Sequence, residues 1–416
     1  MNNRIQIPQG YKDSPLGIIP EEWEVRRLGD IADITSGTTP LRANSKYYND
    51  GIIPWVKTTD LNNGTLYETE EKVSKEAVEK TSLKILPKGT VLVAMYGGFR
   101  QIGRTALLGI DATINQALSA LMCKSSVESS FVLAWLNCQV NYWKRLAASS
   151  RKDPNITGNE VANFPILIPP LEEQERICSV LQLWDSSIEK QSELIEKLKL
   201  RKRALMQQLL TGKKRLPGFC GEWKKRTYSN ILIEIKRSLK WDENELYKLI
   251  SVRRRSEGLF FRESLYGRDI ATKNLRPAKT GDFLISKMQI VHGASGLVTD
   301  KYDDAKISGS YISLVSKDSN ILDIRYYNLW SQMPIFYHQT YVSSFGVHIE
   351  KMTFDLDTFM SYNMPLPPIN EQYAIVSFME SINKEIELAN EKLANLQSQK
   401  RGLMQQLLTG KKRIKY

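Results

Sequence analysis

Two long stretches of the chain carry apolar residues at alternating steps of three and four positions. The first stretch covers residues 177–209 and the second covers residues 375–407. This spacing places the apolar side chains on one face of an α-helix, in the heptad pattern of helices that pack against another helix. A Pro-Pro pair precedes each stretch and Gly212 or Gly410 follows it, and these residues are typical of helix starts and stops. The pattern predicts two long helices, each of which needs a partner.

The two stretches are copies of one another. The string LMQQLLTGKKR occurs at residues 205–215 and again at 403–413, and 23 of the 47 positions in 169–215 are identical in 367–413. Pairing of the two helices with each other in antiparallel direction is the economical arrangement, because the segment between them can bring the chain back. Lys202 and Lys400 occupy the same position of the heptad face, where they either set the register or extend their charged ends to solvent.

The regions before the two helices correspond more weakly. A turn and a β-rich run at 88–93 match 280–285, a second strand-like run at 117–122 matches 311–315, and aromatic-rich helical segments surround Trp135 and Trp330. The sequence therefore predicts an α+β protein with pseudo-two-fold internal duplication, in which two long antiparallel coiled-coil helices separate two mixed α/β domains. The expected domains are 1–168 and 216–366, and the expected helical segments are 169–215 and 367–416.

Composition adds a positive charge that is spread over the chain. The formal net charge is +12, and each of the four segments is net positive. A distributed positive field strengthens binding to phosphate without specifying sequence, so nucleic acid is the simplest partner. The sequence has no apolar run of bilayer length and no signal peptide, which predicts a cytoplasmic protein.

Chemistry-bearing motifs are absent from the sequence. The four cysteines have no CxxC spacing, and there is no HExxH motif, no phosphate-binding loop and no adenine-methyltransferase signature. Glu234-Ile235-Lys236 is better explained as a solvent-facing strand edge than as half of a nuclease site. We expect no catalytic residue, no metal site and no cofactor in this chain.

The repeated arrangement resembles the specificity subunit of Type I restriction-modification systems. The residues that carry this resemblance are the Pro-Pro-Leu-Glu-Glu-Gln run at 169–174, its variant at 367–372 and both LMQQLLTG strings. The run 53–60 and Ile114-Asn115-Gln116 also resemble elements of target recognition domains, whereas the second domain has degenerate forms or none. The resemblance implies that each domain binds one half of a bipartite DNA target, while the helices hold the half-sites at fixed spacing.

The resemblance also implies partner proteins. The helices would dock two methyltransferase (modification) subunits, and restriction or translocase subunits would complete the complex. The methyltransferase would use S-adenosylmethionine, and the restriction subunit would use ATP and Mg. Because the outward positions of the two copies are identical without the heptad requiring it, we expect the docking sites to include Gln207, Gln208, Gln405 and Gln406.

Base and phosphate contacts require Arg, Lys, Asn, Gln, His or Ser side chains on exposed loops. Gly97-Gly98 and the basic residues after it form one such loop, and residues 287–292 occupy the corresponding place in the second domain. The candidate DNA-binding residues are Arg42, Asn44, Lys46, Lys57, Arg100, Gln101, Arg104, Arg151, Lys152, Arg253, Arg254, Lys287, Gln289, His292 and Ser343.

Three other functions remain open at this point. The chain could be the recognition subunit of a related modification enzyme outside Type I, or a coiled-coil scaffold that binds only proteins. It could also be an enzyme of an unfamiliar fold, for which a convergent set of acid, base and nucleophile would be expected.

Overall fold

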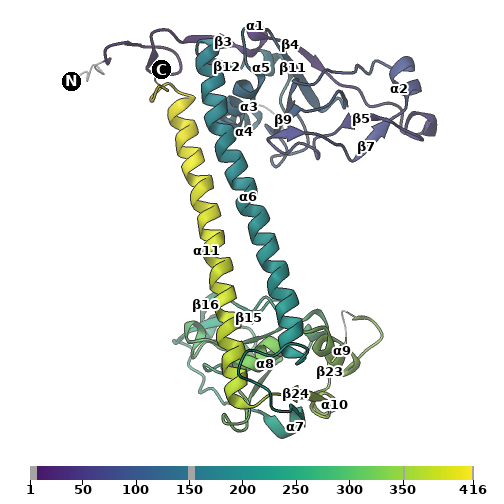
Figure 1. The fold of residues 1–416 in the computed structure, drawn as a ribbon, viewed down its shortest axis with the longest axis vertical. Coiled ribbons are helices and arrows are strands. Elements are labelled where there is room, and N and C mark those ends of the chain that lie inside the picture. The colour runs from purple at the N-terminus through teal and green to yellow at the C-terminus, as the bar shows by residue number, and fades with distance from the viewer. Residues whose placement is uncertain (1–6, 149–154, 350–351, 415–416) are drawn as a thin grey trace. The chain divides into compact units, whose positions relative to one another are not determined.

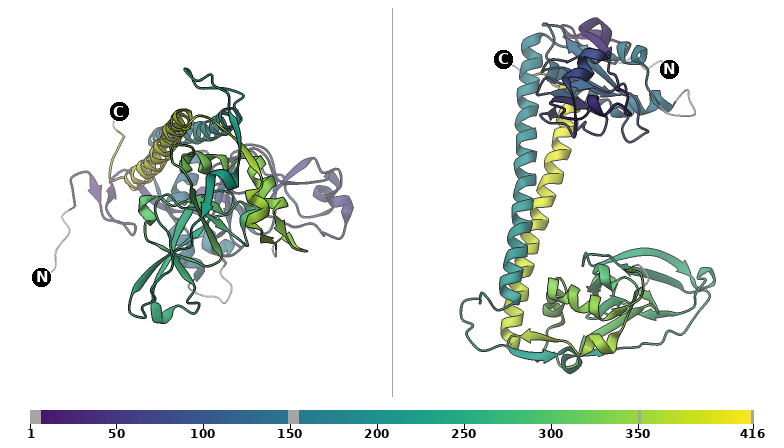
Figure 2. Two further views of the ribbon diagram at one scale, coloured as in Figure 1. Left: turned by 90° about the horizontal axis from the view of Figure 1, so that it is seen from below. Right: turned by 90° about the vertical axis from the view of Figure 1, so that its right-hand side faces the viewer.

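Each of two compact units is built from its own mixed α/β domain and from parts of two long helices. The structure is a computed structural model that describes residues 7–148, 155–349 and 352–414. Unit 1 is Met1–Ser192 with Glu391–Tyr416, and unit 2 is Glu193–Asn390. Figures 1 and 2 show strands and short helices gathered beside the long helices in each unit. The predicted α+β class with two mixed domains is confirmed.

The two long helices are α6 (Leu171–Leu210) and α11 (Ile369–Leu407). Each begins at the residue directly after its Pro-Pro pair, as predicted. Gly212 and Gly410 both have φ of +71°, in the left-handed region that glycine adopts without steric cost. The amide two residues later donates to a carbonyl of the last helical turn in each copy, at 3.1 Å. Both helices therefore end in the same Schellman-type cap.

Within unit 1, the first half of α6 lies beside the last part of α11 in antiparallel direction. Glu173, near the start of α6, bonds to Arg413, while Asp185 three turns later bonds to Lys400. The residue numbers thus rise along α6 as they fall along α11. The predicted antiparallel direction is confirmed here, and the contacts of unit 2 described below run in the same direction.

The heptad faces enter the cores of the two domains. In unit 1, Ile177 and Leu181 of α6 join Leu407 of α11 in the main core, together with Trp23 and Trp135 of the domain. In unit 2 the core takes the opposite ends of both helices. Each domain is therefore completed by the start of the helix that follows it and by the end of the other long helix.

Unit 1 contains a five-stranded sheet in the order β4-β11-β8-β9-β6 and a three-stranded sheet in the order β10-β5-β7. The short elements of this unit are β1 (Tyr11–Lys12), β2 (Ile19–Pro20), β3 (Glu24–Arg27), α1 (Leu28–Ile31), β4 (Ala32–Ser36), β5 (Ile53–Val56), β6 (Thr65–Leu66), β7 (Glu71–Val73), α2 (Lys75–Lys80), β8 (Val91–Ala94), β9 (Thr105–Leu108), β10 (Thr113–Ile114), β11 (Leu118–Cys123), α3 (Ser129–Cys138), α4 (Val140–Ala148), α5 (Gly158–Ala162) and β12 (Pro165–Ile168).

Unit 2 contains a four-stranded sheet in the order β14-β21-β18-β19 and another in the order β16-β15-β20-β17. Its short elements are β13 (Lys224–Thr227), α7 (Tyr228–Ile231), β14 (Leu232–Glu234), β15 (Leu246–Val252), β16 (Leu259–Tyr266), β17 (Leu275–Pro277), β18 (Phe283–Ser286), β19 (Ser295–Leu297), β20 (Lys306–Ser308), β21 (Tyr311–Ser316), α8 (Ile324–Trp330), α9 (Pro334–Val342), β22 (Ser344–Phe345), β23 (Thr353–Phe354), α10 (Leu356–Met360) and β24 (Asn363–Leu366).

The sheet topologies of the two units correspond in most strands, although β6 of unit 1 and β17 of unit 2 have no counterpart. The antiparallel run β4-β11-β8-β9 matches β14-β21-β18-β19, and the β12–β3 pair matches the β24–β13 pair. The parallel pair of β5 with β10 is repeated by β15 with β20. The strand that the degenerate sequence of the second domain did not reveal is therefore present as β15. Topology is retained because it depends on the alternation of apolar residues, which tolerates substitution.

The matched sequence segments occupy matched strands and helices. The runs at 88–93 and 280–285 form the turns into β8 and β18, and the runs at 117–122 and 311–315 form β11 and β21. Trp135 lies on α3 and Trp330 on α8, and both are buried. In the described part of the chain, no helix combines the length and apolar content needed to cross a membrane.

Candidate nucleic-acid interface

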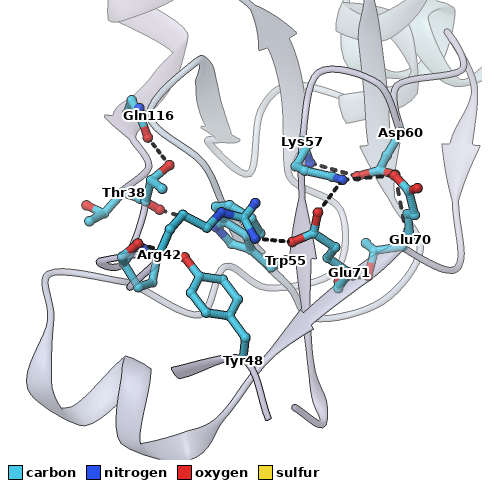
Figure 3. A network of polar contacts seen from close by, with 12 residues as sticks. Thr38, Arg42, Tyr48, Trp55, Lys57, Asp60, Glu70, Glu71 and Gln116 are labelled. Atoms are coloured by element: carbon cyan, nitrogen blue, oxygen red, sulfur yellow. Dashed lines mark hydrogen bonds and ion pairs between the residues drawn. The ribbon is translucent and has the colours of Figure 1, made fainter. Parts of the chain in front are cut away.

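Two of the predicted cations of unit 1 converge on one carboxylate. Arg42 bonds to Glu71 at the start of β7 at 2.6 Å, and Lys57, directly after β5, bonds to the other oxygen of Glu71 at 2.6 Å. Lys57 also bonds to Glu70 at 2.8 Å. Figure 3 shows these side chains pointing toward one another from β5, β7 and the loop before them. The fold thus brings the side chains of Arg42 and Lys57, which are 15 positions apart in the sequence, to the same carboxylate.

The electrostatics of this cluster follow from its hydrogen bonds. The bonds from Arg42 and Lys57 lower the pKa of Glu71, and the bonds to Glu70 and Glu71 raise the pKa of Lys57. Because the folded-state pKa of Glu71 lies below its usual value, the cluster contributes stability above that usual pKa and loses it as pH falls through the lowered one. Lys57 is 18% exposed, so we assign it to positioning the loop.

The Arg42 guanidinium also lies over two aromatic rings. Its central carbon is 4.6 Å from the ring centroid of Tyr48 and 4.8 Å from that of Trp55. The Trp55 indole donates to the Thr38 carbonyl at 3.2 Å. These contacts hold Arg42 in one orientation, while about half of its side chain stays exposed. Arg42 therefore retains a charged edge that can meet a phosphate or a base.

The neighbouring candidates Asn44 and Lys46 differ in whether their polar groups are free to contact DNA. The Asn44 side chain accepts from the Lys46 amide and caps a short 3-10 helix at residues 45–47. Its oxygen is thus used locally. Lys46 is exposed.

The loop between β8 and β9 carries the next set of candidates. Gly97 and Gly98 have φ of +109° and +79°, which explains the glycine pair because other residues rarely adopt this conformation. Arg100 is exposed at the turn, and Arg104 donates to the Gln101 side chain at 3.0 Å. An added β-carbon on Gly97 would lie 3.6 Å from the Thr58 hydroxyl. The loop after β5 and the β8–β9 loop are therefore neighbours.

In unit 2 the β18–β19 loop occupies the place of the β8–β9 loop. It contains Lys287, Gln289 and His292, so the predicted equivalence of position is confirmed by the strand order. The Arg255 amide donates to the His292 carbonyl at 2.7 Å, and the Ser256 amide donates to the Gly293 carbonyl at 2.8 Å. In unit 1 the loop after β5 lies next to the β8–β9 loop. In unit 2 the loop after the matching strand β15 likewise contacts the β18–β19 loop.

The basic run after β15 is exposed. The Arg253 guanidinium lies 5.1 Å from the ring centroid of Phe260, and Arg254 follows it. Arg253 takes the place after β15 that Lys57 takes after β5. The two units therefore present a basic residue at the same end of corresponding strands, although the sequences around them differ.

Ser343 requires a correction. We predicted it on an exposed loop, but its exposure is 0% and it closes the C-terminus of α9. Its carbonyl accepts the Asp355 amide at 2.8 Å. The prediction was wrong because the polar Ser-Ser pair is covered by the chain around Phe354. Arg151 and Lys152 lie outside the described residues.

Sequence reasoning missed the most strongly bonded groups near the domains. Glu371 is 0% exposed and accepts from Arg215 at 2.5 and 2.6 Å and from the Trp223 indole at 3.1 Å. In unit 1, Glu173 accepts in the same way from Arg413 at 2.6 and 2.8 Å and from Trp23 at 3.0 Å. The signal was available, because Glu and Arg recur in both copies at a spacing of 198 positions and Trp recurs at a spacing of 200.

The four predicted docking residues are exposed. Gln207 and Gln208 lie at the end of α6, and Gln405 and Gln406 lie at the end of α11. Their carbonyls accept from the Thr side chain or the amide that closes each helix. Their side-chain amides are left facing solvent, which a docking role requires.

Among residues 7–148, 155–349 and 352–414, no three His, Cys, Asp or Glu side chains gather in a way that could hold a metal ion. The polar sites of the two units are instead loops rich in Arg, Lys and amide side chains. These groups suit the hydrogen-bonding edges of bases and the phosphate backbone.

Comparison with known proteins identifies a family match in both halves. The family described as "Type I restriction modification DNA specificity domain" matches residues 20–200 and again residues 222–398. The MjaIX specificity subunit of a Type I restriction enzyme from Methanocaldococcus jannaschii is 31% identical over 198 residues, which are 46% of this chain and 45% of that protein. This match spans about half of each chain.

A longer match and a structural neighbour extend the comparison. The putative MjaX specificity subunit from the same organism is 25% identical over 450 residues, covering 98% of this chain and 97% of that protein. The crystal structure of the HsdS subunit from Thermoanaerobacter tengcongensis has a TM-score of 0.51 at 18% identity, covering 94% of this chain and 98% of that one. At this identity the structural likeness supports the fold alone.

Proposed function

The chain belongs to the Type I restriction modification DNA specificity domain family, and on this basis we propose that it is the DNA specificity subunit of a Type I restriction-modification complex. Each recognition domain binds one half of a bipartite DNA target. The observation that carries this proposal is the repeated sheet topology, β4-β11-β8-β9 and β14-β21-β18-β19, with different loops at the same position. A repeated scaffold with divergent basic loops suits two different half-sites.

The chemistry of the loops supports direct contact with bases. The β8–β9 loop offers Arg100 and Gln101, and the β18–β19 loop offers Lys287 and Gln289. Arginine, lysine and glutamine are the side chains that pair with guanine and adenine edges in the major groove. Arg253 and Arg254, in the neighbouring loop of unit 2, suit phosphate contacts that position the domain.

Arg100→Ala is expected to weaken binding to one half-site by about 1–3 kcal/mol, because Arg100 is the exposed cation of its loop and acts locally. The measurement is DNA affinity at fixed salt for the full target, for targets altered in either half and for random DNA. Lys75→Ala on α2 is a control that removes an exposed cation elsewhere in the domain. Equal weakening on target and random DNA would assign Arg100 to the phosphate backbone instead.

We infer that the long helices set the number of unspecified base pairs between the half-sites and dock the modification subunits. The exposed glutamine pairs at the ends of α6 and α11 are equivalent, which suits two copies of one partner. Methyl transfer and DNA cleavage belong to partner subunits, which bring S-adenosylmethionine, ATP and Mg, and this chain needs no cofactor of its own. We place the complex in the cytoplasm.

Changing all four residues Gln207, Gln208, Gln405 and Gln406 to alanine is expected to release the methyltransferase subunits in a pull-down. Each changed pair is expected to remove one of the two copies, as measured by the mass of the complex. The exposed positions Glu193 and Glu391 provide a matched set of alanine controls. A quadruple variant that retains both methyltransferase copies contradicts the docking role.

The central experiment is co-expression with a Type I methyltransferase subunit that assembles with this chain, followed by genome-wide mapping of methylated adenines. We expect a bipartite motif with a fixed gap. Replacing residues 216–366 with the corresponding region of another family member should change only one half of that motif. A well-formed complex with an intact methyltransferase that gives no methylation dependent on this chain would contradict the proposal.

A further inference from the structure

A basic cavity in unit 2 is not explained by recognition of the DNA sequence. It has a volume of about 470 Å³ and lies between α6, α11, the loop after β15 and α9. Four cationic residues line it, Lys199, Lys202, Arg203 and Arg255, and its lining contains no carboxylate. Such an accumulation of like charge is unfavourable unless a counter-charge is supplied.

The internal duplication shows that the equivalent cavity of unit 1 contains a counter-charge. In unit 1, Lys400 forms an ion pair with Asp185, and both line the cavity at the equivalent place. The duplicated counterpart of Lys400 is Lys202, and that of Asp185 is Asn383, since both pairs differ by 198 positions. Lys202 therefore faces an amide where its counterpart faces a carboxylate.

The remaining cations are not neutralised by carboxylates across the cavity. Lys199 pairs with Glu196 of its own helix at 2.7 Å, and Glu196 is not part of the lining. In the described part of the chain, no carboxylate lies within ion-pair distance of Lys202, Arg203 or Arg255. Burial lowers the pKa of Lys202, which shows that its charge is poorly compensated here. A bound anion would reverse that effect.

The loop on the far side of the cavity is held in an uncommon conformation. Arg255 and Ser256 have φ of +60° and +54°, which non-glycine residues rarely adopt. Their amides are fixed by the β18–β19 loop, and the Ser256 hydroxyl lies 2.7 Å from the Tyr337 hydroxyl. Two consecutive strained residues that the surrounding structure holds in place are characteristic of a functional site.

We propose that this cavity is a binding site for a phosphate group, held by Lys202, Arg203 and Arg255. A phosphate monoester brings up to two negative charges and several acceptor oxygens, which matches three uncompensated cations better than a single carboxylate does. Asn383 and the Tyr337 hydroxyl add neutral donors to the same lining. The phosphate belongs either to a free phosphorylated small molecule or to the backbone of DNA.

The first arm of the test measures inorganic pyrophosphate binding to the full chain by isothermal titration calorimetry. We expect one site per chain. Asn383→Asp, which restores the carboxylate present in unit 1, is expected to weaken binding about tenfold to a hundredfold, the worth of one charged contact. Lys202→Met is expected to weaken it by a similar factor. Because Asn383 is exposed, its substitution does not challenge folding.

Matched controls separate a local site from general charge effects. Asn395→Asp makes the same amide-to-acid change at an exposed position of α11 in unit 1, and Lys400→Met removes the lysine that already has a partner. Both variants are expected to bind pyrophosphate as the unchanged protein does. Equal weakening by Asn395→Asp and Asn383→Asp would overturn the proposal.

The second arm distinguishes the source of the phosphate and uses a random-sequence duplex, so that it does not depend on specific recognition. If the phosphate is part of DNA, Asn383→Asp lowers duplex affinity and reduces the dependence of log affinity on log salt by about one unit, and Asn395→Asp does not. Pyrophosphate binding with unchanged duplex affinity assigns the site to a free ligand. If Asn383→Asp alters neither measurement, there is no phosphate site.

Discussion

Glu371→Ala is expected to lower the free energy of unfolding of unit 2 by about 3–5 kcal/mol, which is the usual cost of breaking a buried ion pair from one side. The Glu371 side chain is fully buried. It accepts hydrogen bonds from two nitrogens of the Arg215 guanidinium and from the indole N–H of Trp223. Removing the carboxylate takes away the acceptor that the Arg215 guanidinium and the Trp223 indole N–H share. On its other side this cation donates to the Gly221 carbonyl at 2.8 Å.

Hydrogen exchange measured by mass spectrometry resolves this effect by unit. Amides of β13, β24 and the first turns of α11 are expected to exchange faster in Glu371→Ala, because they surround the lost carboxylate. Glu196→Ala is the control, since its ion pair with Lys199 is exposed and contributes little. Exchange rates in Glu371→Ala that match those of the control would contradict a stabilising role for this pair.

The same argument applies to unit 1 through different residues. Glu173, bonded to Arg413 and Trp23, is 5% exposed. The bond with Glu173 raises the pKa of Arg413, so the guanidinium remains charged at every accessible pH. Arg413 ties the segment after α11 to the start of α6, and the contact is possible only because the helix segments are antiparallel.

Gln372→Leu is expected to destabilise unit 2 by about 3 kcal/mol or more, because each buried polar group left without a partner costs about 1–3 kcal/mol. The side chain is 0% exposed. Its oxygen accepts from the Asp323 amide at 2.9 Å, and its nitrogen donates to the carbonyls of Ile321 at 2.8 Å and Pro367 at 2.9 Å. Leucine keeps the volume and removes all three bonds.

Thermal and urea unfolding of the full chain measure this loss. Gln208→Leu makes the same substitution at an exposed position of α6, where no comparable set of buried bonds is broken, and is expected to change stability little. Gln174→Leu should affect unit 1 in parallel, because Gln174 bonds to the Glu128 amide and the Pro169 carbonyl. Equal stability of Gln372→Leu and Gln208→Leu would show that these bonds contribute nothing net.

The Glu-Gln dipeptide after each Pro-Pro pair illustrates how far the sequence could be interpreted. Its recurrence marked both helix starts and carried the family resemblance. Its physical reason required the structure, because the Arg215 partner of Glu371 is 156 positions away and two of the three groups bonded by Gln372 belong to the loop before α8. Periodicity and caps are local properties, whereas a bond between distant residues depends on how the chain packs.

The candidate site divides in a similar way. The equivalence of the β18–β19 loop in unit 2 to the β8–β9 loop in unit 1 could be predicted, because turns and strand patterns recur at matching places. The burial of Ser343 and the capture of Lys57 by Glu70 and Glu71 could not be predicted. Side-chain polarity indicates which residues can bind DNA, but exposure and neutralisation depend on neighbours that the sequence does not specify.

The sequence by itself determined the duplication, the two helices with their starts and stops, the heptad faces and the order of the main strands, since each follows from local spacing of residue types. Only the tertiary structure decided which carboxylate meets which cation. Asp185 forms an ion pair with Lys400 in unit 1, whereas Asn383, at the duplicated position, gives Lys202 no carboxylate partner. That difference has a physical meaning only because antiparallel packing places these residues opposite Lys400 and Lys202, far from them in the sequence.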